Sequence, residues 1–229
     1  MSDHAHDLQL LQEAMDRLLP AVGKLDNAAL GESSRLPGWT RGHVLAHLAR
    51  NADALVNVLE GRPMYASAEA READIARGAA RPLSEHLTDL HESHERIRLT
   101  ASVPADWSRT VELRNGVTDT AANVLFRRLI EVELHHVDLG IGYELGDLSE
   151  EFTSREIRFL ADRWSGHADV PPVILTATDG RQWQTGGSTG TPARLSGTPA
   201  ELLAWLSGRG DKGAALVTTD GPLPALPPL

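Results

Sequence analysis

Residues 123–143 read NVLFRRLIEVELHHVDLGIGY, and this stretch has the pattern of a helix that packs against other helices. At 100° per residue, most of its circumference is apolar. The remaining narrow polar stripe contains Arg127, Arg128, Glu131, His135 and Asp138. Residues four apart lie on adjacent turns of one face, so the side chains of Glu131 and His135 can converge on one point.

A carboxylate and an imidazole on adjacent turns form half of a common zinc site. The same pair would also fit a solvated stripe, and this segment alone leaves both interpretations open. His47 changes the balance because it lies in the apolar arc of an earlier helix. A buried imidazole needs partners for its ring nitrogens, and these can be polar side chains or a metal ion. We therefore predict a divalent metal held by His47, Glu131 and His135, with one position open for water or substrate.

Two other histidines are weaker candidates. His43 is four residues before His47 and falls at the edge of the apolar arc, so it ranks lower as a ligand. His94 lies in the apolar stripe of another helix. The ligand types suit zinc, and they do not distinguish zinc from nickel or iron.

The first part of the chain has helical periodicity, which one long connection interrupts. Four amphipathic helices and one long crossover predict a helical bundle. The expected helices cover about residues 7–19, 40–59 with Thr40 as N-cap, a third from Ser84, and 119–143, and the connection 62–82 holds a short helix around 67–77.

The last third of the chain mixes helices and strands. Thr198-Pro199 is a strong helix start, and Gly208 ends that helix. We expect an α+β protein, with a helical bundle over residues 1–150 and a small α+β domain over 151–229. The other elements expected in this domain are a helix over 151–166 and strands over 172–178, 181–185, 193–197 and 214–218.

Composition excludes several classes of function. The 229 residues carry a net charge of −10, which argues against nucleic acid and anionic membranes as partners. The chain has no cysteine, so it has no thiolate metal site and no cysteine nucleophile of its own. The N-terminus lacks the pattern of a signal peptide, and no apolar stretch is long enough to span a bilayer. We expect a cytoplasmic protein.

Four segments together resemble one family, the mycothiol-dependent maleylpyruvate isomerases of the DinB-like metal-binding superfamily. The first two are LPGWTRGHVLAHLARNADAL (36–55) and EVELHHVDLG (131–140). The other two are PMYASAEAREADIARG (63–78) and SGTPAELLAWLSGRGDKGA (196–214). The first segment alone marks only the superfamily, whereas the combination is specific to this family.

The resemblance implies a DinB-like four-helix bundle that holds zinc through His47, Glu131 and His135. It also implies a sterol-carrier-like C-terminal domain in which Arg209 acts in catalysis. The implied reaction converts maleylpyruvate into fumarylpyruvate, with mycothiol as thiol cosubstrate, in the gentisate route of aromatic degradation. A planar guanidinium at Arg209 suits a substrate carboxylate, although a basic group after a helix C-terminus also stabilises the helix dipole.

Two other functions compete with this isomerase. A metal-dependent mycothiol S-transferase would share the metal ligands and lack the contacts specific to the substrate. A non-catalytic metal-binding stress protein would not need an open coordination position. The arginine of the Gly208-Arg209-Gly210 segment and the 63–78 connection favour the isomerase.

Overall fold

Two compact units make up the chain, Met1–Tyr143 and Glu144–Leu229. The computed structural model describes residues 4–219 and 221–227. The division lies slightly earlier in the chain than the boundary expected at residue 150. The α+β fold class is confirmed, because the first unit is mainly helical and the second combines helices with a sheet.

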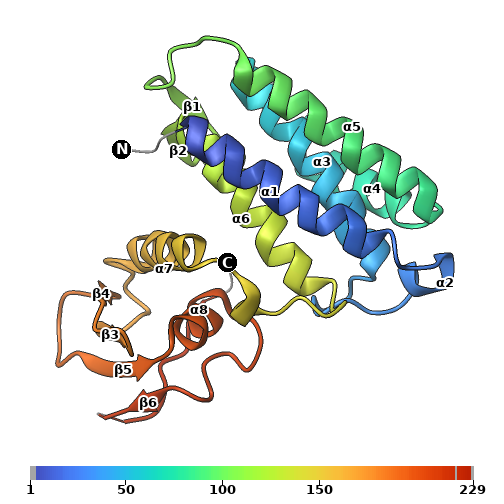
Figure 1. Cartoon of the computed structure of the whole chain (residues 1–229). Coiled ribbons are helices and arrows are strands. Elements are labelled where there is room, and N and C mark those ends of the chain that lie inside the picture. Colours follow the sequence, from blue (N-terminus) through green and yellow to red (C-terminus); the bar gives the residue numbers. More distant parts are fainter. Residues whose placement is uncertain (1–3, 220, 228–229) are drawn as a thin grey trace. The chain divides into compact units, whose positions relative to one another are not determined.

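The first unit is built on four long helices, which lie side by side in Figure 1. Helix α1 packs against α5 and α6, and α3 packs against α4, α5 and α6. Their inward faces carry buried aliphatic side chains, among them Leu11, Leu48, Leu90 and Leu125. The helices are α1 (His4–Val22), α2 (Asn27–Leu30), α3 (Arg41–Leu59), α4 (Ala68–Ala79), α5 (Leu83–Ser102) and α6 (Asn123–Asp138).

Helix α3 starts where its sequence predicts. The Thr40 side chain accepts a hydrogen bond from the backbone N–H of His43, and the Thr40 backbone N–H donates to Nδ1 of His43. This reciprocal capping box satisfies two backbone donors that a helix start leaves free. The capping box also holds the His43 ring at the start of α3, one turn before His47.

The predicted start of the fourth helix at residue 119 is wrong. Residues 110–112 and 118–120 form a two-stranded antiparallel hairpin, β1 (Thr110–Glu112) and β2 (Thr118–Thr120), and α6 begins only at Asn123. Asn115 and Gly116 both have positive φ at the hairpin turn, at 61° and 72°. An Asn-Gly pair is a common signal for such a turn, because both residues tolerate positive φ, and the helix prediction did not use it. The predicted helix end at residue 143 is also too late, because α6 stops at Asp138.

The second unit packs two helices with a four-stranded sheet. Helix α7 (Glu150–Trp164) contacts α8 (Pro199–Ser207) and β4, so the helix expected over 151–166 belongs to this unit. The strand order is β4-β3-β5-β6, in which only the β3–β5 pair is parallel. The strands are β3 (Val173–Ala177), β4 (Gln182–Thr185), β5 (Ala193–Gly197) and β6 (Val217–Thr218).

Helix α8 has the predicted cap at each end. Thr198 and Glu201 form a capping box, and Gly208 takes the left-handed conformation with φ of 65°. The last strand is shorter than the expected 214–218. Residues 211–215 form turns, in which the Asp211 carboxylate accepts from the backbone N–H groups of Gly213 and Ala215.

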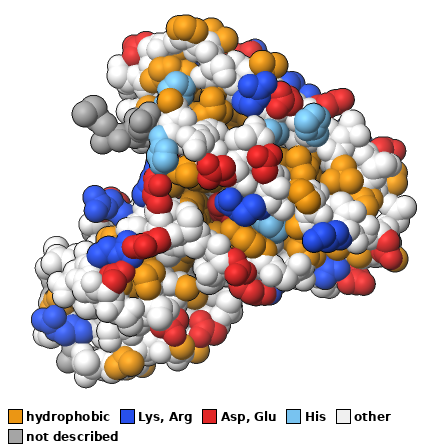
Figure 2. All heavy atoms as spheres, viewed as in Figure 1, with side chains coloured by type: hydrophobic (Ala, Val, Ile, Leu, Met, Phe, Trp, Pro, Cys, Tyr) orange, Lys and Arg blue, Asp and Glu red, His pale blue; other side chains and the backbone are white. Residues whose placement is uncertain are grey.

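The surface carries charges of both signs. Figure 2 shows Lys and Arg side chains scattered among acidic ones on the face in view. Within the described ranges, no helix combines the length and the apolar character needed to cross a membrane.

Candidate metal centre

His47 is held inside the bundle by the helix that carries it. Its side chain is 6% exposed, on α3. The edge of its ring meets the rings of Trp39 and His135, with centroid distances of 5.4 and 4.8 Å. These contacts leave Nε2 facing α6.

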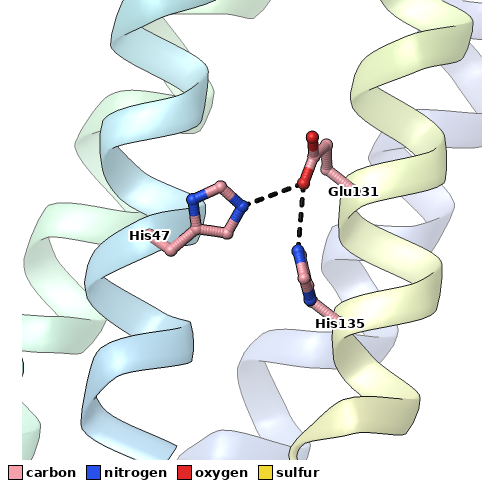
Figure 3. A group of neighbouring side chains, drawn as sticks. All are labelled: His47, Glu131 and His135. Atoms are coloured by element: carbon pink, nitrogen blue, oxygen red, sulfur yellow. Dashed lines mark hydrogen bonds and ion pairs between the residues drawn. The ribbon is translucent and has the colours of Figure 1, made fainter. Parts of the chain in front are cut away.

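Glu131 and His135 reach the same point from α6. Oε2 of Glu131 lies 2.9 Å from Nε2 of His47 and 3.0 Å from Nε2 of His135. Figure 3 shows the three side chains pointing toward one another between the two helices. One ligand atom of each lies within 4.8 Å of the others. The structure therefore brings together the three residues that the helix pattern singled out.

The Nδ1 atoms of the two imidazoles have different neighbours. Nδ1 of His135 lies 2.8 Å from Oδ2 of Asp138, whose side chain is 2% exposed. This is the usual second contact of a metal-binding histidine, because it orients the ring and places the Nε2 lone pair toward the ion. Nδ1 of His47 lies 3.3 Å from Nη2 of Arg71 on α4 instead. Asp138 belongs to the polar stripe of residues 123–143, but the sequence predicted no role for it and gave no indication of Arg71.

The protonation states of these three side chains favour the binding of a cation. Burial raises the pKa of Glu131, but hydrogen bonds from His135 and His47 outweigh burial and hold that pKa well below its usual value. Burial lowers the pKa of His47, so this imidazole is neutral at pH 7 and can act as a ligand. For His135, burial is outweighed by the contacts with Asp138 and Glu131, which raise its pKa.

The donor set fits zinc or a related divalent ion. Two imidazoles and one carboxylate are a common three-ligand set, which leaves a tetrahedral position open. With ligand bonds of about 2.0–2.1 Å, a tetrahedral ion holds its ligand atoms about 3.4 Å apart. The present separations of 2.9 and 3.0 Å need only a slight opening. The Glu131 side chain is 32% exposed, so the site is accessible to solvent.

The polar stripe of α6 is not a solvated face. Arg128 is completely buried and Asp138 and His135 nearly so, which makes the solvated-stripe alternative wrong for these residues. Nη1 of Arg128 donates to Oδ1 of Asn51 at 2.9 Å, one helical turn from Glu131 on α6 and from His47 on α3. Burial lowers the pKa of Arg128 to about 10, although Glu131 opposes the shift, so this arginine stays positively charged at neutral pH.

A cavity of about 700 Å³ lies in the same unit, between the start of the long connection and the β1–β2 hairpin. Tyr65 lines it, together with Arg62, Arg109 and Arg114. Burial raises the pKa of Tyr65, and the charges of Arg71 and Glu131 also act on this phenol. Tyr65 therefore lies close to both the cavity and the metal centre, and the volume is in the range of small-molecule sites.

The other candidate residues lie elsewhere. Nε2 of His94 lies 3.0 Å from Oε1 of Gln12, away from the three-residue group. Arg209 follows the Gly208 cap of α8 in the second unit, where its backbone N–H donates to the carbonyl of Ala204 and its Nη1 to that of Ser207. Its part in catalysis stays a prediction.

Comparisons with known proteins agree along the whole chain. The model of the mycothiol maleylpyruvate isomerase N-terminal domain matches residues 11–140, and that of the C-terminal domain of the same family matches 147–228. Two similar solved structures are a mycothiol-dependent maleylpyruvate isomerase and its variant with one histidine replaced by alanine. Each is 27% identical, covers 99% of this chain and 97% of its own, and has a TM-score of 0.89. A search of curated protein sequences gave no match.

Proposed function

The chain belongs to the mycothiol maleylpyruvate isomerase family, and on that premise we propose that it converts maleylpyruvate into fumarylpyruvate with zinc and mycothiol. The observation that carries this proposal is the convergence of His47, Glu131 and His135 within 4.8 Å. Such an isomerase would act in the gentisate route of aromatic degradation, in the cytoplasm.

The absence of cysteine supports an external thiol. Cis–trans change about a conjugated double bond requires a temporary loss of its double-bond character. A thiolate achieves this by adding its sulfur to one carbon of the bond, while the π electron pair moves toward the conjugated carbonyl. Rotation and expulsion of the same thiolate restore the double bond in the trans geometry, with no net gain or loss of atoms or electrons. Because the chain has no thiol of its own, mycothiol would supply it.

The residues of the bundle would prepare the site for this chemistry. His47, Glu131 and His135 would hold the ion, and Asp138 would orient His135 through its Nδ1 contact. When bound, a divalent ion supplies positive charge that lowers the pKa of a thiol or polarises a carbonyl. The partial exposure of Glu131 leaves room for an incoming ligand at this point.

Arg209 is our candidate for a catalytic group from the second unit. The substrate carries two carboxylates at neutral pH, whereas the protein has a net charge of −10. Binding must therefore depend on local positive charge, and a guanidinium can hold a carboxylate through two parallel hydrogen bonds.

A turnover assay tests the proposed function. Zinc-loaded protein should isomerise maleylpyruvate only when mycothiol is present, and His47→Ala should abolish this activity. His91→Ala, which removes an exposed imidazole on α5, serves as the matched control and should keep it. Turnover that is independent of thiol would refute the mechanism. Transfer of mycothiol to an electrophile, without isomerisation, would instead support the S-transferase.

A further inference from the structure

Arg71 is placed beside the metal centre by a close approach of two helices. A Cβ atom at Gly42 would lie 2.2 Å from the carbonyl oxygen of Ala79, and one at Gly78 would lie 2.8 Å from the Cβ of Ala46. These two glycines let α4 contact α3 with almost no space between the backbones. The Arg71 side chain, near the start of α4, is then only 11% exposed and extends to His47.

The contact between Arg71 and His47 does not suit a metal-bound histidine. An imidazole that gives its Nε2 lone pair to a metal carries its proton on Nδ1, and this N–H needs an acceptor. Asp138 provides an acceptor for His135. A guanidinium has only donors, so Arg71 and the Nδ1–H of a metal-bound His47 would face each other as two donors. With the metal in place, the Arg71 guanidinium therefore needs another acceptor.

The remaining contacts of Arg71 are weak. Its Nη1 pairs with the carboxylate of Glu72, a side chain that is 57% exposed. Because the Glu72 carboxylate is largely in contact with water, we expect this ion pair to contribute little, about 0–1 kcal/mol. Tyr65 also contacts Arg71: the guanidinium carbon lies 5.7 Å from the ring centroid, and the guanidinium donates a hydrogen bond to the phenol oxygen, a neutral group that does not neutralise its charge. An anion beside the metal could therefore recruit Arg71 at small cost.

We propose that Arg71 is a substrate-binding residue, whose guanidinium binds a carboxylate of the dicarboxylate substrate at the metal centre. The identity of that anion rests on the proposed function. Arg71 lies in the same unit as the metal ligands and contacts one of them, so its charge is within reach of a ligand bound at the open position. Its planar fork can form two parallel hydrogen bonds with a carboxylate.

Calorimetric binding of maleate, a cis-dicarboxylate, to the zinc-loaded protein tests this proposal without any turnover. Arg71→Gln should weaken maleate binding by about ten- to a hundredfold, because it removes a charge-assisted hydrogen bond. Arg77→Gln is the matched control, since Arg77 lies on the same helix, is exposed and pairs with Asp74. The control should bind maleate as the wild type does.

Zinc affinity, measured by competition with a chelator, separates substrate binding from support of His47. Arg71→Gln should bind zinc at least as tightly as the wild type, because it removes a donor that opposes the metal-binding form of His47. Unchanged maleate affinity, or weaker zinc binding, would overturn the proposal, as would a wild type that does not bind maleate. Arg71→Lys, which keeps the charge, provides a second variant if Arg71→Gln does not fold, and it should also weaken maleate binding. If the protein does not turn over maleylpyruvate, the proposed function is refuted. The maleate-binding test does not use turnover, so its result would still decide the proposal for Arg71.

Discussion

At the scale of single residues, Asp138 contacts one of the three proposed metal ligands. Its carboxylate lies 2.8 Å from Nδ1 of His135 and is almost fully buried. We expect Asp138→Asn to weaken zinc binding by about ten- to a hundredfold, because partners of this kind orient the ligand and increase its basicity. Chelator competition measures the effect. Glu95→Gln, which removes an ion pair on α5, should leave zinc affinity unchanged.

His94 gives the fold a pH dependence of its own. Burial, followed by the charge of Arg128, lowers its pKa to about 4 in the folded protein. As pH falls, the unfolded chain takes up this proton first, near pH 6.5, so stability is lost from there down to about pH 4. The sign follows because the unfolded state binds more protons in this window.

Chemical unfolding of metal-free protein at pH 7 and pH 4 measures this effect. His94→Gln should lose less stability over this range than the wild type, by about 1–3 kcal/mol. An identical pH dependence in the two proteins would show that His94 is not responsible.

At the scale of elements, Gly42 allows α4 to pack against α3. Alanine in a helix normally stabilises by about 1 kcal/mol relative to glycine, but here its Cβ would lie 2.2 Å from the carbonyl oxygen of Ala79. Gly42→Ala should therefore destabilise the protein by about 1–3 kcal/mol, as overpacking does. Urea unfolding measures the change.

Gly31→Ala is the control for this substitution, because its Cβ would make an ordinary contact of 3.5 Å. Equal stabilities of the two alanine variants would contradict the packing argument.

The convergence of His47, Glu131 and His135 was predictable from sequence because helical periodicity determines which side chains share a face. Glu131 and His135 are four residues apart on one helix, and His47 lies in the apolar arc of another. Arg71 was not predictable in this way. Its place depends on how closely α4 approaches α3, and this depends on a backbone contact that periodicity does not describe. The β1–β2 hairpin was missed because its strands have only three residues each, too few for a clear alternation.

At the scale of the whole molecule, charge decides how an anionic substrate can bind. The net charge of −10 would repel the proposed dicarboxylate substrate, so a few cationic groups would have to attract it. Among the arginines of the chain, Arg209 was chosen because of the family resemblance. No pattern of residue spacing pointed to it. In the structure its backbone and Nη1 hydrogen bonds are those of a residue that follows a helix end.

We expect Arg209→Lys to lower kcat/KM for maleylpyruvate by about ten- to a hundredfold, because lysine keeps the charge and loses the bidentate fork. Zinc content should not change, since Arg209 is not a ligand. Full activity of the lysine variant would mean that Arg209 acts only as a charge at the end of α8.

Metal analysis of purified protein tests the central claim most directly, because it asks whether the three converging side chains hold an ion. We predict one equivalent of divalent metal per wild-type chain and none in His47→Ala, with His43→Ala, altered only at the cap of α3, still binding one. Undiminished metal in His47→Ala would contradict the assignment of His47, Glu131 and His135 as the ligands.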